Sequence, residues 1–310
     1  MTNTTAGDTE TVLVMNPLSG TGDHGPDVRD RAALSGYTLR ETQHEKHAIE
    51  LAQSAAESGA DEVVAVGGDG TLNEIVCGVR AADALDRVTV GVVPVGTGND
   101  FATNIGITSL DNAFRILREG QRRWLDLGLA DGQPFVNSCL AGVIAEASGE
   151  TSSELKSRFG PLAYVLTTLR MATAFTGIDL RAVVDDGSET ETVWEGTATV
   201  VLVGNGRRFS LSGSEQANVE DGLFDVTIIE DIDSLDLAQE RLQERLLHRE
   251  GEHLTRFLAS SLELDIEASS PATFSLDGEI LEEESLSLRN CRQVLRMPVG
   301  DGYEPRPGVL

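Results

Sequence analysis

The sequence predicts an α/β protein of two domains, in which a parallel sheet covered by helices precedes a mainly antiparallel β domain. Three observations lead to this fold class. The 310 residues suffice for two domains, each with its own hydrophobic core. Up to about residue 120, apolar strands alternate with helical patterns, as in right-handed βαβ units. After about residue 122, most apolar segments are strands bounded by turn residues, which favours antiparallel pairing.

The expected elements of the first domain follow in chain order. They are strands at 11–17, 37–42, 63–66 and 88–93, and helices at 47–58, from 72 onward and at 109–119. Loops at 16–22, 67–71 and 94–100 all follow strand ends. Open α/β sheets bind ligands at the carboxyl ends of their strands, so these loops should converge on one crevice.

The glycine-rich segment 67–74 is the most informative stretch of the chain. It reads Gly-Gly-Asp-Gly-Thr-Leu-Asn-Glu and directly follows the apolar run 63–66, which predicts a buried strand, a tight turn and a helix. Its three glycines let backbone N–H groups approach an anion, and the helix N-terminus adds positive potential. Asp69 would repel a bare phosphate, which favours a nucleotide-phosphate site where magnesium neutralises the charge. The alternative is a simple strand–helix turn with Asp69 as its N-cap.

The second half contains mainly strands. They are expected at 122–129, 134–140, 178–185, 191–203, 223–229, 261–267, 272–276 and 285–296, with helical stretches near 160–175 and 234–258. The segment 155–176 is apolar with few charges. It is either a lid or membrane-facing helix, or a helix packed on the β domain.

The composition restricts the partners and the environment. There are 51 acidic and 24 basic residues, and the net charge is -27. This argues against a nucleic-acid partner, since such binding depends on Lys and Arg. It suits a halophile's cytosol, where molar salt screens the self-repulsion.

Cys77, Cys139 and Cys291 lie far apart in apolar sequence, which predicts reduced core thiols. Neither a signal peptide nor a run of about 18 uncharged apolar residues is visible, so we expect a cytoplasmic protein without an anchor.

Taken in order, the motifs resemble those of the diacylglycerol kinase catalytic family, which includes sphingosine and ceramide kinases, and especially its soluble prokaryotic members. The matching segments are Asn16-Pro17-Leu18-Ser19-Gly20, Thr42 with His47-Ala48, Gly67 to Glu74, Pro94 with Gly96 to Ala102, Asp126-Leu127-Gly128, Phe135-Val136-Asn137 with Gly142, Gly160 to Tyr164, Asp221 to Asp225, and Asp277-Gly278-Glu279. The glycine motif alone is weak, because NAD kinases and phosphofructokinases share it. Its combination with the other segments is specific and covers almost the whole chain.

The resemblance implies a Rossmann-like nucleotide domain at 1–125, a β-sandwich lipid domain at 126–289, and a segment of about 290–310 that returns to the first domain. It implies an active site between the domains that uses ATP and Mg²⁺. The implied nucleotide-binding residues are Asn16, Pro17, Leu18, Ser19, Gly20, Thr42, Gly67, Gly68, Asp69, Gly70, Thr71, Leu72, Asn73, Glu74, Gly96, Thr97, Gly98 and Asn99. The implied magnesium site comprises Asn218, Asp221 and the carbonyl of Leu223, and Glu279 is implied as the acid–base group.

Phosphoryl transfer requires positioning and charge neutralisation more than covalent help. Asp69, Asp100 and Asp126 could share the metal, and either Glu279 or Asp277 could take the hydroxyl proton if partial burial between the domains raised its pKa. Each also has a structural alternative: Asp100 as a helix cap, Asp126 as a turn acid, and 277–279 as a hairpin turn.

The segment 205–213 departs from the family pattern, where relatives carry a glycine-rich run. This leaves the lipid acceptor open and makes the position of Asn218 in the family pattern dependent on an altered stretch.

Two other functions compete with an ATP-dependent lipid kinase: an NAD kinase, in which the late Asp-Gly motifs are not expected, and a non-catalytic lipid- or nucleotide-binding regulator. A kinase would meet its lipid at a membrane surface, and the arginines at 122–123, 207–208 and 241–249 are candidates for head-group contact. The sequence leaves open whether the protein forms a homodimer.

Overall fold

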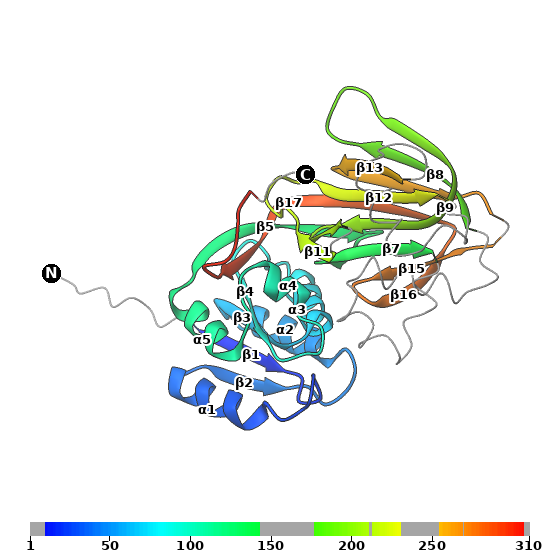
Figure 1. Ribbon diagram of the computed structural model, residues 1–310. Coiled ribbons are helices and arrows are strands. Elements are labelled where there is room, and N and C mark those ends of the chain that lie inside the picture. The colour runs from blue at the N-terminus through cyan, green and yellow to red at the C-terminus, as the bar shows by residue number, and fades with distance from the viewer. Residues whose placement is uncertain (1–9, 143–176, 211–212, 231–253, 269, 307–310) are drawn as a thin grey trace. The chain divides into compact units, whose positions relative to one another are not determined.

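The computed structural model describes residues 10–142, 177–210, 213–230, 254–268 and 270–306 (Figure 1). The chain divides into two compact units. The first contains the chain up to Leu125 together with Val294–Glu304, and the second consists mainly of Asp126–Gln293. The strands β5 (Gln121–Ala130) and β17 (Ser285–Val299) each run from one unit into the other.

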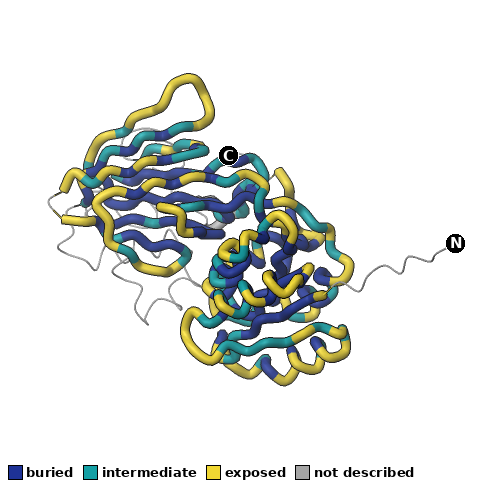
Figure 2. Tube along the Cα trace, turned by 180° about the vertical axis from the view of Figure 1, so that it is seen from behind, coloured by how far each residue is buried: buried dark blue, intermediate teal, exposed yellow. Residues whose placement is uncertain are grey.

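The first unit is built on a four-stranded parallel sheet in the order β2-β1-β3-β4. The strands are β1 (Thr11–Met15), β2 (Thr38–Glu41), β3 (Glu62–Gly67) and β4 (Thr89–Pro94). All residues of β1 and β3 are buried, as expected for strands of a covered parallel sheet (Figure 2). The predicted parallel α/β arrangement is therefore confirmed.

Within the described residues, five helices accompany this sheet. They are α1 (Gly25–Ser35), α2 (His47–Glu57), α3 (Asp69–Ala81), α4 (Asp100–Asn104) and α5 (Leu110–Glu119). Sequence analysis did not predict α1, whose polar residues give little helical patterning, although Gly36 ends it in the left-handed conformation. The helices α2 and α3 pack closely at Gly78, which has no side chain. A Cβ at this position would lie 2.3 Å from the carbonyl oxygen of Ile49.

The second unit contains a large, mainly antiparallel sheet, as predicted. Its order is β16-β15-β7-β9-β8-β14-β17-β5-β6, with β12 pairing to both β9 and β13. The additional strands are β6 (Gln133–Phe135), β7 (Ser138–Gly142), β8 (Ile178–Asp185), β9 (Thr192–Gly204), β12 (Phe224–Glu230), β13 (Leu254–Ala259), β14 (Ser261–Ile266), β15 (Ala272–Leu276) and β16 (Glu279–Glu283). A separate hairpin joins β10 (Arg207–Ser210) to β11 (Gly213–Gln216).

The long strand β9 lets this sheet curl around a core. Its first half pairs with β8, whereas its last residues pair with β7 on one side and β12 on the other. Residues 198–204 are all buried. The core includes Phe135, Phe224 and Phe274, and the rings of Phe135 and Phe224 stack with centroids 5.5 Å apart.

Three predictions for the second half differ from the structure or lie outside the described residues. The strand predicted at 134–140 is two strands, β6 and β7, interrupted where backbone N–H groups bind a side chain instead of a neighbouring strand. The helix predicted at 234–258 is wrong at its end, because β13 pairs with β12 there. The rest of that stretch, the helix predicted near 160–175 and the segment 155–176 lie outside the described residues.

The cysteines carry no disulfide in this structure: Cys139 is buried, whereas Cys77 and Cys291 are partly accessible. Burial raises the pKa of the Cys139 thiol, so this group is an unreactive core thiol as predicted. Within the described part of the chain, none of the helices is long and apolar enough to cross a membrane.

Candidate functional site

Three loops of the first unit meet at the carboxyl ends of β1, β3 and β4, as predicted. A Cβ on Gly20 would lie 2.3 Å from the carbonyl oxygen of Val95, so the loop after β1 touches the loop after β4. A Cβ on Gly96 would lie 2.4 Å from the Cα of Gly68, so the loop after β4 also touches the turn after β3. The backbone N–H of Asn16 donates to the Val66 carbonyl at 3.0 Å. Glycine is required where these backbones approach one another.

Asp69 joins two of these loops. It is the first residue of α3, and its carboxylate accepts hydrogen bonds from the backbone N–H groups of Asp100, at 3.0 Å, and Phe101, at 3.1 Å. Asp69 therefore caps α4 and not its own helix, whose N-cap is Gly68. The N-cap residue of α3 is Gly68 and that of α4 is Asn99, so the predictions of Asp69 and Asp100 as the N-cap residues of their own helices are both wrong.

Gly70 differs from its neighbours in having open space around it. A Cβ on Gly67 would collide with Thr71, and one on Gly68 would lie 2.7 Å from the Gly98 carbonyl oxygen, but a Cβ on Gly70 would meet no atom within 4 Å. Gly70 is exposed and does not need glycine's conformational freedom, because its φ is not positive. The absence of a side chain there leaves the N-terminus of α3 accessible to a ligand, as an anion cradle requires.

The remaining implied nucleotide residues lie in these same loops, with different exposure. Thr97 and Gly98 are exposed, and Asn99 closes its loop by bonding both the N–H and the carbonyl of Gly96. Leu18 is 86% exposed, so its side chain is available on the surface. Leu72 is fully buried and its N–H donates to the Gly68 carbonyl, which leaves this residue without a group for a ligand.

The other implied nucleotide-binding residues are neither as exposed as Leu18 nor as fully buried as Leu72. Thr42 follows β2, and its N–H donates to Met15 at the end of β1. Asn73 is buried on α3, and its Oδ1 atom has no hydrogen-bond partner. Pro17, Ser19, Thr71 and Glu74 are at least partly buried at the edges of the same loops.

In the second unit, Asp126 holds the turn that contains Asp221. Its carboxylate accepts from the backbone N–H groups of Gly222, at 2.6 Å, and Gln293, at 2.7 Å, and its own N–H donates to the Val219 carbonyl at 2.7 Å. Asp126 is 1% exposed. Burial raises the pKa of Asp126 to about 6 against the opposing effect of the two N–H donors, and the nearby Asp221 carboxylate raises it further.

This turn has the ligand chemistry of a hard divalent cation. Asp126, Asp221, the amide oxygen of Asn218 and the carbonyl of Leu223 are all oxygen donors, which Mg²⁺ and Ca²⁺ prefer. Burial also raises the pKa of Asp221, and a cation would relieve the repulsion between the two carboxylates. Asn218 and Asp221 each accept a local backbone bond, from Glu220 and Leu223, and a carboxylate or amide oxygen has a second lone pair for a metal. The residues therefore fit the predicted metal site.

Asp277 lies in the two-residue hairpin loop between β15 and β16, as the structural alternative predicted. Both loop residues, Asp277 and Gly278, have positive φ, as a type I′ turn requires. The Asp277 carboxylate accepts from three consecutive backbone N–H groups, those of Val136, Asn137 and Ser138, at 2.6, 2.9 and 2.8 Å. Both of its oxygens are therefore engaged in holding the junction of β6 and β7, and the alternative role of Asp277 as the base stays a prediction.

Glu279 begins β16 directly after that turn and is exposed. The partial burial of its carboxylate was expected from the pairing of the two domains and stays a prediction. The three aspartates expected to share a metal belong to different units, and their sharing of an ion stays a prediction. Asp69 and Asp100 lie in the first unit, and Asp126 lies with Asp221 in the second.

Sequence analysis missed Asn205, which connects the two acidic turns of the second unit. Asn205 is 1% exposed, and its Nδ2 donates to the carbonyls of Asp126, at 3.3 Å, and Val136, at 2.9 Å. Its Oδ1 accepts from the Nδ2 of Asn290 at 3.1 Å. The Asn-Gly pair was visible in the sequence only as a turn signal, and no local pattern indicated Asn290.

One of the arginine pairs suggested for head-group contact has a structural role. Arg122 forms an ion pair with the buried Glu62 at 3.1 Å and donates to the Gly120 carbonyl at 2.9 Å. Burial raises the pKa of Glu62, and Arg122 opposes that shift. Arg123 lies over the ring of Tyr303, with its guanidinium carbon 5.9 Å from the centroid. Arg241, Arg245 and Arg249 lie outside the described residues.

Glycine loops on a parallel sheet, followed by an antiparallel unit with two acidic turns, define a two-domain α/β protein with a candidate anion-binding cradle. Two family models match this organisation. Residues 10–130 match the diacylglycerol kinase catalytic domain, and residues 137–298 match the YegS C-terminal NAD kinase beta sandwich-like domain. The chain belongs to the diacylglycerol kinase family of lipid kinases.

Relatives and solved structures agree with this assignment. A probable lipid kinase YegS-like from Pectobacterium atrosepticum is 30% identical over 280 residues, covering 87% of this chain and 89% of the relative. A diacylglycerol kinase from Staphylococcus epidermidis is also 30% identical over 280 residues, covering 86% and 84%. The crystal structure of a putative diacylglycerol kinase from Bacillus anthracis, 21% identical, has a TM-score of 0.76 and covers 98% of this chain and 100% of its own, which shows the shared fold.

Proposed function

We propose that the protein is an ATP- and Mg²⁺-dependent lipid kinase that phosphorylates the hydroxyl group of a diacylglycerol-like or other long-chain lipid alcohol. The observation that carries the proposal is the cradle of the first unit, where three glycine loops meet and Gly70 leaves the N-terminus of α3 open. The curated relatives named as diacylglycerol kinases support the choice of acceptor class.

In this proposal the backbone N–H groups of the cradle bind the nucleotide phosphates, and Asp69 keeps the loop after β4 in place. Glu279 accepts the proton of the lipid hydroxyl as that oxygen bonds to the γ-phosphorus, while the bond from the γ-phosphorus to the bridging oxygen breaks and ADP leaves. Magnesium bound with the nucleotide would neutralise developing charge, and magnesium held by Asp126 and Asp221 would brace the turn of the second unit.

The lipid would be met at the cytoplasmic face of a membrane, and the protein would bind there peripherally. Ile280, an exposed apolar residue next to Glu279, is a candidate for this contact. With a net charge of -27, attraction to anionic head groups cannot drive the contact, unless local basic residues or high salt offset the repulsion.

The deciding experiment measures phosphoryl transfer from radiolabelled ATP by the full chain in about 2 M potassium chloride, where charges are strongly screened. Mixed vesicles containing diacylglycerol and long-chain alcohols serve as acceptors, and NAD is supplied in a parallel reaction. Labelled lipid supports the proposal. Labelled NADP without labelled lipid would identify an NAD kinase, as the name of the second matched domain allows. Binding of ATP or lipid without any labelled product would identify a non-catalytic regulator.

A further inference from the structure

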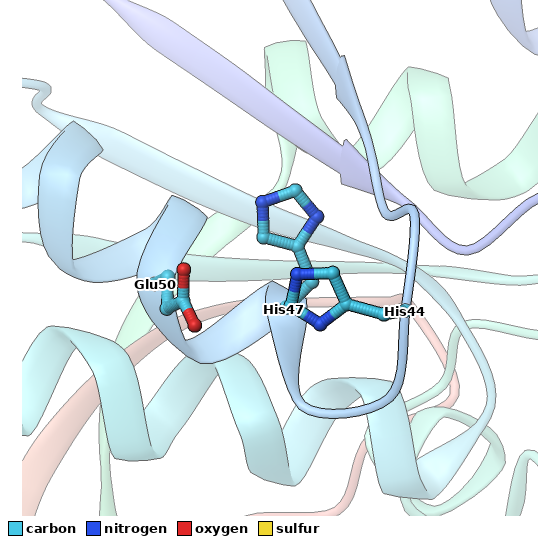
Figure 3. Close-up of side chains that lie close together, drawn as sticks. All are labelled: His44, His47 and Glu50. Carbon is cyan, nitrogen blue, oxygen red and sulfur yellow. The ribbon is translucent and has the colours of Figure 1, made fainter.

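Three potential metal ligands lie together at the start of α2, and none belongs to the site described above. His44 lies in the loop after β2, His47 is the first residue of α2, and Glu50 follows one turn later (Figure 3). One ligand atom from each side chain lies within 4.8 Å of those of the other two. Among the described residues, no other three His, Cys, Asp or Glu side chains meet this closely.

We propose that His44, His47 and Glu50 bind a divalent transition-metal ion, and that Zn²⁺ suits them best. Two imidazole nitrogens and one carboxylate oxygen form a ligand set that zinc accepts with tetrahedral geometry, leaving a fourth position for water. Imidazole ligands also suit Cu²⁺, Ni²⁺ and Co²⁺. Mg²⁺ is a weak competitor, because it prefers oxygen ligands and retains several waters.

The hydrogen bond of His44 prepares this ring for a metal. Its Nδ1 lies 2.9 Å from the carbonyl oxygen of Glu45. A carbonyl can only accept, so Nδ1 carries the proton and Nε2 keeps its lone pair when the ring is neutral. Histidines that bind metals commonly donate their second N–H to a carbonyl in this way.

Metal binding requires local rearrangement at His47. Its Nδ1 accepts from the backbone N–H of Gln43 at 3.1 Å, and its ring stacks on that of His44, with centroids 4.4 Å apart and 17° between the planes. A metal lies in the plane of each imidazole that binds it, so the rings must leave the stack. Their ligand atoms must also approach to about 3.3 Å, as bonds of about 2.0–2.1 Å in a tetrahedron require.

The surroundings permit these changes. Gln43 and His44 are exposed, so the loop can move and water can take over the Gln43 N–H. The N-terminus of α2 is the positive end of a helix dipole and disfavours a cation, but Glu50 in the first turn offsets this effect. A bound ion would link the loop after β2 to the first turn of α2.

The test is a calorimetric titration of the full chain with Zn²⁺ in molar potassium chloride, without ATP or lipid. Excess Mg²⁺ in the buffer occupies oxygen-only sites on this acidic surface. We expect one zinc site in the wild type, weakened at least about tenfold in His44→Ala and in Glu50→Gln. Glu57→Gln, which removes a carboxylate near the other end of the same helix, where it accepts from Gln53, should leave zinc affinity unchanged.

Co²⁺ provides a second measurement, because its visible absorption reports tetrahedral coordination, and this signal should be lost in His44→Ala. Equal zinc affinity in the wild type and His44→Ala, or no saturable zinc site in the wild type, would overturn the proposal. So would binding of inorganic phosphate at this cluster in preference to zinc, since the same imidazoles, when protonated, could hold an anion at the helix N-terminus. The outcome does not depend on kinase activity.

Discussion

The carboxylate of Asp69 accepts the backbone N–H groups of Asp100 and Phe101, at 3.0 and 3.1 Å, and so ties the turn after β3 to the helix after β4. The acid expected to organise magnesium therefore also shapes the loop that would surround the nucleotide. Loss of Asp69 should change both the geometry and the charge of the cradle.

We predict that Asp69→Ala reduces phosphoryl transfer by more than about tenfold, equivalent to at least about 1.4 kcal/mol of barrier. It should also lower stability by about 0.5–2 kcal/mol, because α4 loses its cap. Turnover assays and thermal melting measure the two effects. Asp69→Asn keeps one acceptor oxygen and should recover part of the stability while remaining impaired in turnover. A folded Asp69→Ala protein with more than about a tenth of wild-type turnover would contradict the proposed role.

Gly70→Ala should separate nucleotide binding from stability. A Cβ at this exposed position of α3 meets no protein atom, so the substitution should leave stability unchanged or raise it by up to about 1 kcal/mol. ATP affinity, measured by calorimetry, should fall because the Cβ enters the space left for phosphate. Gly78→Ala on the same helix is the control, and it should destabilise the protein because its Cβ would lie 2.3 Å from the Ile49 carbonyl oxygen. Unchanged ATP affinity in Gly70→Ala would place the phosphates elsewhere.

Asp277→Asn should affect mainly stability, whereas Glu279→Gln should affect mainly catalysis. Asp277→Asn loses an acceptor for the N–H groups of residues 136–138 and should cost about 1–3 kcal/mol of stability. Glu279 is exposed, so Glu279→Gln should leave the melting temperature and ATP affinity nearly unchanged while lowering kcat strongly, because an amide does not accept the hydroxyl proton. A fully active Glu279→Gln enzyme would exclude Glu279 as the base.

The magnesium dependence of stability should vary with pH. The pKa of Asp126 is raised to about 6, above its ordinary value near 4, so the folded state binds this proton more tightly than the unfolded state. Its contribution to stability is therefore present below about pH 4 and is lost as the pH rises through about 6. Mg²⁺ binds the ionised carboxylate, so the Mg²⁺-induced rise in melting temperature should be small below pH 6 and full above it.

Asp126→Asn should remove most of this Mg²⁺ effect and flatten the pH dependence between about pH 4 and 6. Its basal stability should also be lower, because the N–H groups of Gly222 and Gln293 lose a carboxylate acceptor. Asp265→Asn replaces an exposed aspartate of the same unit and should respond to Mg²⁺ like the wild type. An identical Mg²⁺ response in Asp126→Asn and the wild type would remove Asp126 from the metal site.

Folding should require high salt. A net charge of -27 with few basic residues causes self-repulsion that about 2 M potassium chloride largely screens, whereas about 0.1 M does not. Circular dichroism and thermal melting in both solutions test this expectation. Equal melting temperatures would exclude adaptation to a halophile's cytosol as the reason for the acidic surface.

The sequence by itself determined the class of fold and the places where ligand loops begin. Apolar strands that end in glycine turns are local patterns, and they predicted β1, β3, β4 and the meeting of their loops. The turn of Asp277 and Gly278 was likewise predictable, because a two-residue hairpin has a local signature.

Only the tertiary structure decided which partners these side chains take. Asp69 bonds to residues 31 and 32 positions away, and Asp277 bonds to residues 139 to 141 positions away. Asn205 meets Asn290 across 85 positions. Local patterns encode burial and backbone conformation, whereas these bonds depend on which strands and loops become neighbours. For the same physical reason, an aspartate within a glycine motif could be predicted as functional, but its role as the cap of a second helix could not.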